Sequence, residues 1–382
     1  MIYTYVGTST VDGVFGGKGK GIYILHLDAM DGSLSPSAVV DVRPDPTWLE
    51  VSKTRSVLYA ACHCNQFEGT AGGAISAYKI DEATGGLSKL NHVLLPHPHP
   101  TAMHLDRSEN FLLVASALGG GVHVITIEPS GELGSISESL QQEGKVAVPP
   151  GVTPAPLPYH PGTRITVAQP GSTLPHCVIT DLSNQYVLVC DLGQSKVYLY
   201  QFDSGLGRLL LVQTLEQREL GAGSRLLAMH PNGKHFYTVN EPGVSLSAYE
   251  LDIASGTIEE RQSISLLPQG IQKDSGWSGS GMVVHPSGHS LYASIRIYDQ
   301  IAHFAIDSDG CLKLKYIIPS GGKVPKTLSL SPDARFLYSA NSLSDSVSAF
   351  AINPGDGTLE PTPQVASVPS PSHVVFFDTS IQ

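Results

Sequence analysis

Basic residues are scarce in this chain of 382 residues, which has 23 lysines and arginines against 34 aspartates and glutamates and a formal net charge of −11. Nucleic acid and anionic membrane surfaces are bound through a basic face, so we expect neither as a partner. Long apolar stretches are absent as well. No segment approaches the ~20 apolar residues that a membrane-spanning helix needs, and no membrane span is predicted.

Cysteines are also few. The five that are present form an odd number without the spacing of a disulfide framework, which fits a reducing compartment. The first ten residues, MIYTYVGTST, lack the basic and apolar regions of a signal peptide. These absences together predict a cytoplasmic protein.

A helical period is missing too, because no window keeps apolar residues at the i, i+3, i+4, i+7 spacing of an amphipathic helix. What the chain has instead is a repeat. Each copy is an apolar strand, a polar turn such as HPNG, HPSG or SPDA, a second apolar strand and then a third. Copies begin near residues 46, 100, 175, 224, 279 and 325, and a seventh is divided between the two ends of the chain. Four short strands per unit, at a period of roughly 40 to 50 residues, are typical of propeller blades.

The repeat predicts the fold. A blade cannot bury both of its faces alone, so blades stack around a common axis, and the divided copy closes the ring by pairing the C-terminal strand with the N-terminal strands. We therefore predict an all-β, single-domain, seven-bladed β-propeller over residues 1–382. Very little helix is expected.

Two segments interrupt the repeat. Residues 135–174 are rich in proline, and residues 262–279 form a second excursion. Long connections in a propeller either carry function or are solvated linkers, and both interpretations remain open. The residues in these segments that are most able to touch a ligand are Tyr159, His160, Arg164 and Trp277.

Because the copies align with one another, unusual residues can be found by comparing blades. The innermost strand of each blade lines the central channel, and small or uncharged residues are expected there, since crowded charges are costly unless paired or solvated. One column of innermost-strand positions reads Thr47, Thr101, His176, Arg225, Ser280, Lys326 and His373. A second column, at the end of the second strand, includes His63, Ala117, Leu192, Glu241, Arg296 and Ser342.

Five residues on consecutive blades depart from this expectation: His176, Arg225, Glu241, Arg296 and Lys326. We interpret them as a site. The alternative is an ion-pair cluster that ties the blades together. His63 is added as a substrate contact, although a histidine at such a position, like His373, is more often a packing residue.

The charges of this group indicate the kind of ligand. Three of its members are cationic in a protein that is acidic overall, which favours a small anionic substrate whose carboxylate or phosphate is bound by Arg225, Arg296 and Lys326. Glu241 would be the general acid or base, and His176 a second proton carrier. This scheme requires neither a metal nor a cofactor.

Two histidine-containing motifs are interpreted without a ligand. In CHC, residues 62–64, alternate side chains of a strand point to opposite faces, so no metal site is expected. In PHPHP, His97 and His99 are expected to lie in a turn with exposed imidazoles.

Several motifs lie along nearly the whole chain: YVGT, GIYILHLD, LPHCV, GSRLLAMHPNGKHFYTVNE, LYASIR and SLSPDARFLYSAN. They resemble the seven-bladed lactonase family, which groups bacterial-type 6-phosphogluconolactonase with fungal 3-carboxy-cis,cis-muconate lactonizing enzyme. The resemblance implies a propeller fold and matches the residues implicated in the lactonizing branch to His176, Arg225, Glu241 and Arg296.

The chain departs from the phosphogluconolactonase branch at three positions. Leu226 stands where that branch usually has histidine, and Gly281 and Val283 replace an acidic residue and a histidine. The retained set is compatible with a lactone-forming isomerase or with an altered lactonase.

We therefore expect an enzyme that forms or hydrolyses a lactone on a small anionic substrate, muconate-lactonizing or phosphogluconolactonase-like. The alternatives are an isomerase or cyclase of another pathway on the same scaffold, and a non-catalytic propeller that binds a protein. The sequence leaves the substrate, the direction of the reaction and the oligomeric state open.

Overall fold

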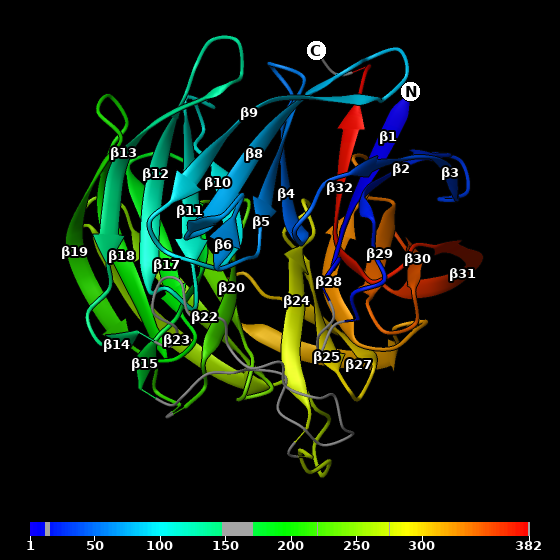
Figure 1. The fold of residues 1–382 in the computed structure, drawn as a ribbon. Coiled ribbons are helices and arrows are strands. Elements are labelled where there is room, and N and C mark those ends of the chain that lie inside the picture. Colours follow the sequence, from blue (N-terminus) through cyan, green and yellow to red (C-terminus); the bar gives the residue numbers. More distant parts are fainter. Residues whose placement is uncertain (12–15, 147–170, 220, 275, 381–382) are drawn as a thin grey trace.

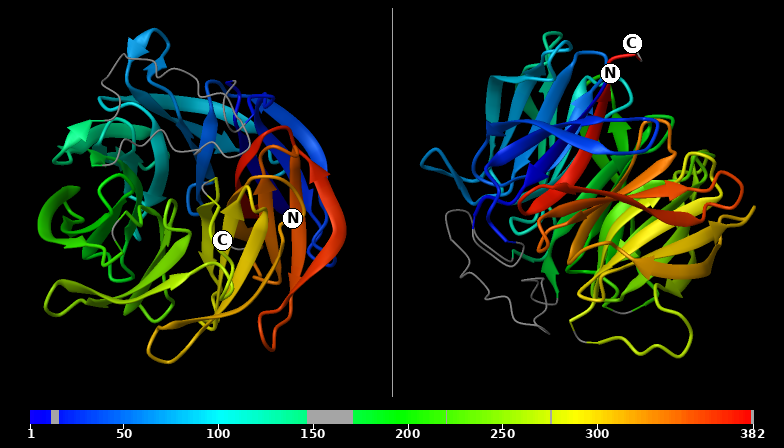
Figure 2. Two further views of the ribbon diagram at one scale, coloured as in Figure 1. Left: turned by 90° about the horizontal axis from the view of Figure 1, so that it is seen from below. Right: turned by 90° about the vertical axis from the view of Figure 1, so that its right-hand side faces the viewer.

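The computed structural model describes residues 1–11, 16–146, 171–219, 221–274 and 276–380. Within these ranges the chain forms seven four-stranded antiparallel sheets arranged as blades around a central axis (Figure 1; Figure 2, left). They contain no helix that could cross a membrane. The predicted all-β, seven-bladed propeller is confirmed.

Four blades come from the N-terminal part of the chain and from its closing strand. From the innermost strand outward, their strands are β32 (Pro371–Asp378), β1 (Ile2–Thr8), β2 (Gly21–Leu27) and β3 (Leu34–Asp41); β4 (Pro46–Ser52), β5 (Val57–Cys62), β8 (Gly73–Ile80) and β9 (Leu87–Leu95); β10 (Pro100–Leu105), β11 (Phe111–Ser116), β12 (Gly121–Ile127) and β13 (Leu133–Gln141); β16 (Pro175–Thr180), β17 (Tyr186–Asp191), β18 (Lys196–Asp203) and β19 (Arg208–Glu216).

Three further blades follow in chain order: β20 (Ser224–Met229), β21 (His235–Asn240), β22 (Ser245–Asp252) and β23 (Thr257–Ser265); β24 (Ser278–Val284), β25 (Ser290–Arg296), β26 (Gln300–Ile306) and β27 (Leu312–Pro319); β28 (Pro325–Leu330), β29 (Phe336–Asn341), β30 (Ser346–Ile352) and β31 (Leu359–Ser367). Two short pairs lie outside the blades: β6 (Gln66–Phe67) with β7 (Thr70–Ala71), and β14 (Lys145–Val146) with β15 (Ser172–Thr173).

The ring closes where the two ends of the chain meet. Strand β1 pairs antiparallel with β32, with Ile2 opposite Asp378 and Val6 opposite Val374. The divided copy is therefore one blade whose innermost strand comes from the C-terminus, as the repeat predicted. Figure 1 shows the two strands side by side.

A tyrosine hydrogen bond repeats between blades. On the second strand of five blades, a buried tyrosine donates its hydroxyl to a glycine carbonyl in the outer turn of the next blade, over 2.7–3.1 Å; the pairs are Tyr5–Gly85, Tyr59–Gly131, Tyr237–Gly310, Tyr292–Gly357 and Tyr338–Gly32. These glycines adopt φ values of 71° to 89°, which side chains disfavour. The DGSL- and TGGL-type turns thus reverse the chain and also accept the bond that joins blade to blade.

Both predicted interruptions are shorter than expected. Strand β13 continues to Gln141, so the first excursion begins after that residue and not at 135. Strand β23 continues to Ser265, and β24 begins at Ser278, which leaves 266–277 for the second. Outermost strands are polar because one edge faces solvent, and their sequences therefore resemble loops. Tyr159, His160 and Arg164 lie outside the described residues.

Candidate active site

Each innermost strand begins with a β-bulge. In β4, Pro46 pairs with Cys62 and Trp48 with Ala61, so Thr47 has no partner across the ladder. The same interruption recurs in every blade, with Gly281 as an additional residue in β24. A bulge bends the strand and re-aims the extra side chain. The bulged residues are Thr47, Thr101, His176, Arg225, Ser280, Lys326 and Ser372.

This register corrects one position of the first predicted column. Gly7 pairs with His373 and Thr8 with Pro371, so the bulged residue is Ser372 and not His373. The His373 ring instead stacks on Trp48 at 4.1 Å, and its Nδ1 accepts the Leu49 amide at 3.2 Å. The error arose because the sequence comparison started this copy at Ser372 and placed His373 in line with Arg225, whereas the strand starts one residue earlier, at Pro371.

The second predicted column lies against the first. The amides of His63, Glu241 and Ser342 donate to the residue that precedes the neighbouring innermost strand: His63 to Asp45, Glu241 to Gly223 and Ser342 to Val324, over 2.8–3.0 Å. Both columns therefore gather where the innermost strands begin. Because β24 and β32 run upward in Figure 1, this is the lower end of the molecule, which faces the viewer in the left panel of Figure 2.

The centre of the site is one carboxylate shared by two arginines. Glu241 Oε2 lies 3.0 Å from Arg225 Nε and 2.7 Å from Arg296 Nη2, and all three side chains are at most 5 % exposed. Arg225 Nη1 also donates to the Ser280 carbonyl, and Arg296 Nε to Ser278 Oγ, each over 3.1 Å. Opposite charges at such distances stabilise one another strongly when water is excluded. Two neighbouring blades, β20–β23 and β24–β27, thus hold the triad in place.

Lys326 lies on the next blade. Burial, together with the positive charge of Arg225, lowers the pKa of Lys326 to about 7, whereas the nearby Asp45 carboxylate acts in the opposite direction. Near neutral pH this lysine is therefore present in both its charged and its neutral form.

Sequence comparison missed Asp45. Its Oδ1 accepts the amides of Thr10 at 2.6 Å and Val11 at 2.9 Å, and burial raises its pKa while Lys326 lowers it. The residue precedes Pro46 in a left-handed conformation with φ of 40°, which aspartate tolerates better than most residues. The predicted columns began one residue later, although an Asp before the strand-starting proline was a visible signal.

Two of the site histidines are neutral. Burial first, then the charge of Arg225, lowers the pKa of His176 well below its usual value. Its buried Nδ1 has no hydrogen-bond partner among the residues the structure describes. Burial and the charge of Lys326 lower the pKa of His63 to about 3.

The expectation of exposed imidazoles in PHPHP is wrong. His99 is buried, its ring lies 4.7 Å from that of His63, and its amide donates to the Cys64 carbonyl. The His97 ring packs at 5.0 Å against His123. The segment enters the channel mouth between two blades, so its polar sequence forms part of a packed junction.

The predicted excess of positive charge is smaller than the sequence indicated. Arg225, Arg296 and Lys326 face two carboxylates, Glu241 and Asp45, which leaves one net positive charge when the lysine is protonated and none when it is neutral. Within the described ranges, no group of three or more His, Cys, Asp or Glu side chains could hold a metal ion.

Trp277 is the one described member of the predicted loop contacts. It stacks on Tyr298 at 4.0 Å and directly precedes Ser278, whose hydroxyl accepts the hydrogen bond from Arg296. The second excursion therefore ends beside the triad.

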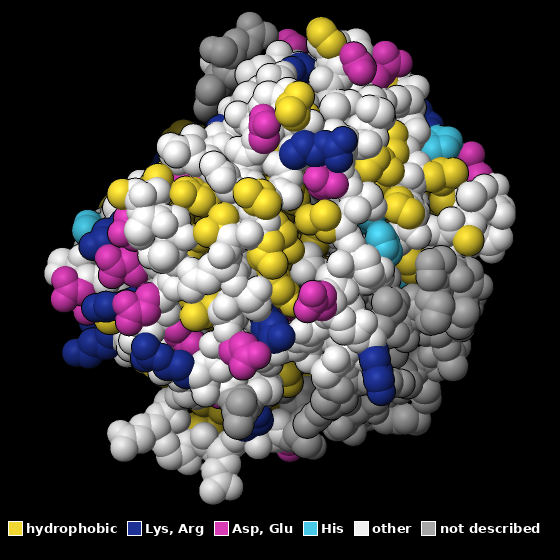
Figure 3. Space-filling view, turned by 90° about the vertical axis from the view of Figure 1, so that its left-hand side faces the viewer, with side chains coloured by type: hydrophobic (Ala, Val, Ile, Leu, Met, Phe, Trp, Pro, Cys, Tyr) yellow, Lys and Arg dark blue, Asp and Glu magenta, His cyan; other side chains and the backbone are white. Residues whose placement is uncertain are grey.

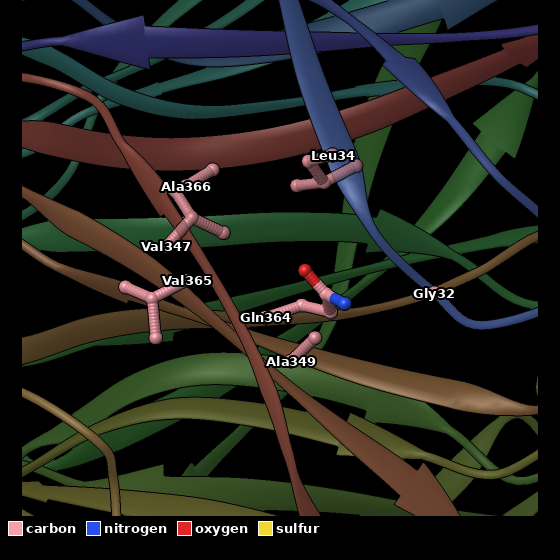
Figure 4. Close-up of a pocket in the computed structure, with 7 residues that line it drawn as sticks. All are labelled: Gly32, Leu34, Val347, Ala349, Gln364, Val365 and Ala366. Atoms are coloured by element: carbon pink, nitrogen blue, oxygen red, sulfur yellow. The ribbon is translucent and has the colours of Figure 1, made fainter.

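A separate small cavity is lined by Gly32, Leu34, Val347, Ala349, Gln364, Val365 and Ala366 (Figure 4). It lies between two neighbouring blades and contains none of the site residues. Its volume of about 20 Å³ is enough for about one water molecule, so it is not a substrate site.

Comparisons with known proteins agree with the seven-bladed fold. Residues 3–376 match the family model described as "Lactonase, 7-bladed beta-propeller". The chain is 29 % identical to a 6-phosphogluconolactonase of Bacillus subtilis over 97 % of both proteins, and 27 % identical to one of Erwinia tasmaniensis over 90 % of this chain and 92 % of the other. The structure of the Pseudomonas aeruginosa periplasmic gluconolactonase PpgL superimposes with a TM-score of 0.82 at 23 % identity, covering 99 % of both chains, which supports the fold.

Proposed function

Because the chain belongs to the seven-bladed β-propeller lactonase family, we propose that it hydrolyses the lactone of a small sugar acid that carries a phosphate or carboxylate group. The observation that carries this proposal is the carboxylate of Glu241, buried at the channel mouth between two guanidinium groups. Relatives from Bacillus subtilis, Formosa agariphila and Erwinia tasmaniensis are each described as 6-phosphogluconolactonase. That makes 6-phosphogluconolactone the first substrate to test.

Hydrolysis of a lactone needs three things from the protein. A base accepts a proton from the attacking water, positive charge stabilises the oxyanion that forms at the carbonyl, and a proton is returned to the ring oxygen that leaves. The guanidinium groups of Arg225 and Arg296 lie close together because both contact the Glu241 carboxylate. They would stabilise the oxyanion without reorganising during the reaction.

Two groups could move the proton. Glu241, whose carboxylate lies against both arginines, would accept a proton from the attacking water. His176 is buried in its neutral form with an unpartnered Nδ1, and a neutral imidazole can accept a proton. Lys326, with a pKa of about 7, would bind the remote anionic group of the substrate.

The decisive experiment is lactone turnover in a pH-stat with 6-phosphogluconolactone and with unphosphorylated gluconolactone. Wild type should hydrolyse the anionic lactone with the lower KM. His176→Gln and Glu241→Gln separate the two proton carriers, because only loss of the true base removes the acidic limb of the pH–rate profile. Folded protein, verified by circular dichroism, that hydrolyses neither lactone would refute the proposal.

A second candidate reaction is lactone formation on a muconate-type dicarboxylate. The observation in its favour is the tight backbone packing at Gly281, where a Cβ would lie 2.7 Å from the Leu328 amide nitrogen. The acidic residue usual in the phosphogluconolactonase branch does not fit at this position without a backbone shift. Absorbance assays with a carboxymuconate, run beside the hydrolysis assay, test this alternative.

A further inference from the structure

The outermost strands of the blades differ in one place. Strand β19, the leftmost in Figure 1, carries the run Leu210-Leu211-Val212, and these side chains are 66 %, 50 % and 45 % exposed. Leu206, in the turn just before the strand, is 67 % exposed. The other large exposed hydrophobic residues are scattered along the chain, whereas these four fall within seven positions. We call these four residues the β19 patch.

Comparison with the other blades shows that the patch is not a property of the fold. Leu210 pairs with Gln201 of the third strand. The corresponding outer-strand residue in five other blades is polar or charged: Ser35, Ser88, Glu259, Lys313 and Glu360. Edge strands normally carry such residues because exposed backbone and apolar side chains invite association. Only β19 lacks this protection at that position among these six blades.

The face around the patch is the one seen in Figure 3, where hydrophobic side chains gather near the centre with acidic and basic groups around them. Contiguous exposed apolar patches of this kind mark interaction surfaces. The charges along β19 indicate the partner. Arg208 and Glu216 lie at the two ends of the strand, each four residues from Val212, and their side chains are 60 % and 79 % exposed.

We propose that the β19 patch binds a second copy of this chain, forming a two-fold symmetric dimer with the two β19 strands antiparallel and centred on Val212. This register places Arg208 opposite Glu216 of the partner subunit twice across the interface, and it covers the apolar run of both copies. Identical surfaces that meet about a two-fold axis are self-complementary.

Two features of β19 agree with a dimer that does not extend into a longer assembly. Val212 is the extra residue of a bulge, since Leu211 pairs with Tyr200 and Gln213 with Leu199, and a bulge interrupts any continuous ladder along the edge. Side-chain contact rather than an extended sheet therefore joins the copies. Within one copy, Arg208 lies 3.4 Å from Glu138 and Glu216 lies 3.6 Å from Lys196, but the high exposure of both ends leaves them able to reach a partner.

The test is the molar mass in solution, measured by light scattering and by sedimentation from about 1 to 100 µM. Wild type should have twice the monomer mass at the upper end of this range. Leu211→Lys should weaken dimerisation at least tenfold, because a charge would enter the apolar centre. Val365→Lys is the matched control: Val365 is 57 % exposed on the outer strand β31, and its replacement should leave the mass unchanged.

A charge swap tests the register. Arg208→Glu and Glu216→Arg should each weaken the dimer, and the double variant should restore it to within a few-fold of wild type, because the opposite charges face each other again. If the charges acted only through Glu138 and Lys196, the two losses would add. A monomeric wild type, a dimer unaffected by Leu211→Lys, or no recovery in the double variant would each overturn the proposal. Lactone turnover does not enter these outcomes, so they are independent of the proposed function.

Discussion

The bulged residues at the channel mouth fall into two groups that share a backbone conformation and differ in what their side chains reach. The first group consists of residues with hydroxyl side chains, and these join neighbouring blades. Thr101 Oγ1 donates to the His176 carbonyl, Ser280 Oγ to that of Lys326 and Ser372 Oγ to that of Thr47, over 2.7–3.0 Å.

The second group has the ionisable side chains of His176, Arg225 and Lys326, of which Arg225 binds a carboxylate. Arg225 binds Glu241, and only its Nη1 still reaches the next blade, at the Ser280 carbonyl. A short hydroxyl can contact only the adjacent strand, whereas a long guanidinium reaches across to the end of a second strand. The same repeated bulge therefore carries Ser or Thr where it links blades, and Arg, Lys or His where it contributes to the candidate site.

Among the variants that test this difference between the two groups, Glu241→Gln should have the largest effect on activity and stability. The arginines lose their shared counter-ion, so we expect kcat for lactone hydrolysis to fall about 10²–10⁴-fold and the free energy of unfolding to fall by about 3–5 kcal/mol. Steady-state kinetics and urea denaturation measure the two effects. Ser372→Ala is the control, because Ser372 is one of the bulged residues with a hydroxyl side chain. It should keep kcat within about twofold of wild type. Near wild-type values of both quantities in Glu241→Gln would contradict the assignment.

Lys326 provides a test through pH. Since its pKa is about 7, binding of an anionic substrate should weaken as the pH rises from 6 to 8.5 and the lysine loses its charge. Lys326→Met should raise KM about tenfold at pH 6 and have a much smaller effect at pH 8.5. Initial rates across this range give the KM profile. A wild-type KM without inflection near pH 7 would remove Lys326 from substrate binding.

Lys326→Met should weaken substrate binding but increase the stability of the folded protein. The folded-state pKa of Lys326 lies below the ordinary value of 10.5, so the folded protein binds fewer protons than the unfolded chain between these values. This cost of folding is absent above pH 10.5, grows as the pH falls and is complete below about 7. Lys326→Met should therefore be more stable by about 1–3 kcal/mol at pH 6, with the gain shrinking toward pH 10. Denaturation at both pH values checks the sign, and a gain that grows with pH would be inconsistent with it.

Thr101→Val should have the smallest effect. It removes the hydrogen bond to the His176 carbonyl without changing the volume of the side chain, and should lower the free energy of unfolding by about 1 kcal/mol. If the Thr101 hydroxyl has only a structural role, kcat should stay within twofold of wild type. A tenfold fall in kcat would show instead that this link positions His176 for the reaction.

Periodicity explains why the fold could be predicted. Strand, turn and strand recur with the same spacing, and a divided copy has only one way to close a ring, so the pairing of β1 with β32 followed from the chain alone. The candidate site was found because the repeat supplies its own comparison. His176, Arg225 and Lys326 stand out only against the Thr and Ser of equivalent blades, and they occupy bulges in the structure.

Other features could not be found this way, because a one-residue shift reverses the face of a strand. Alignment of Ser372-His373 with Ser224-Arg225 made His373 resemble a bulged residue, and only the hydrogen-bond register identified Ser372. Asp45 was missed for a related reason, since its left-handed backbone turns a residue outside the strand toward Lys326.

The sequence by itself thus determined the number of blades, the closure of the ring and the blades that carry charge, because these depend on local pattern and its repetition. The tertiary structure decided which charges are paired, that one carboxylate holds two arginines, and that the lysine titrates near neutrality. Those properties depend on distances between blades and on the exclusion of water, and neither is recorded in the order of residues along a single strand.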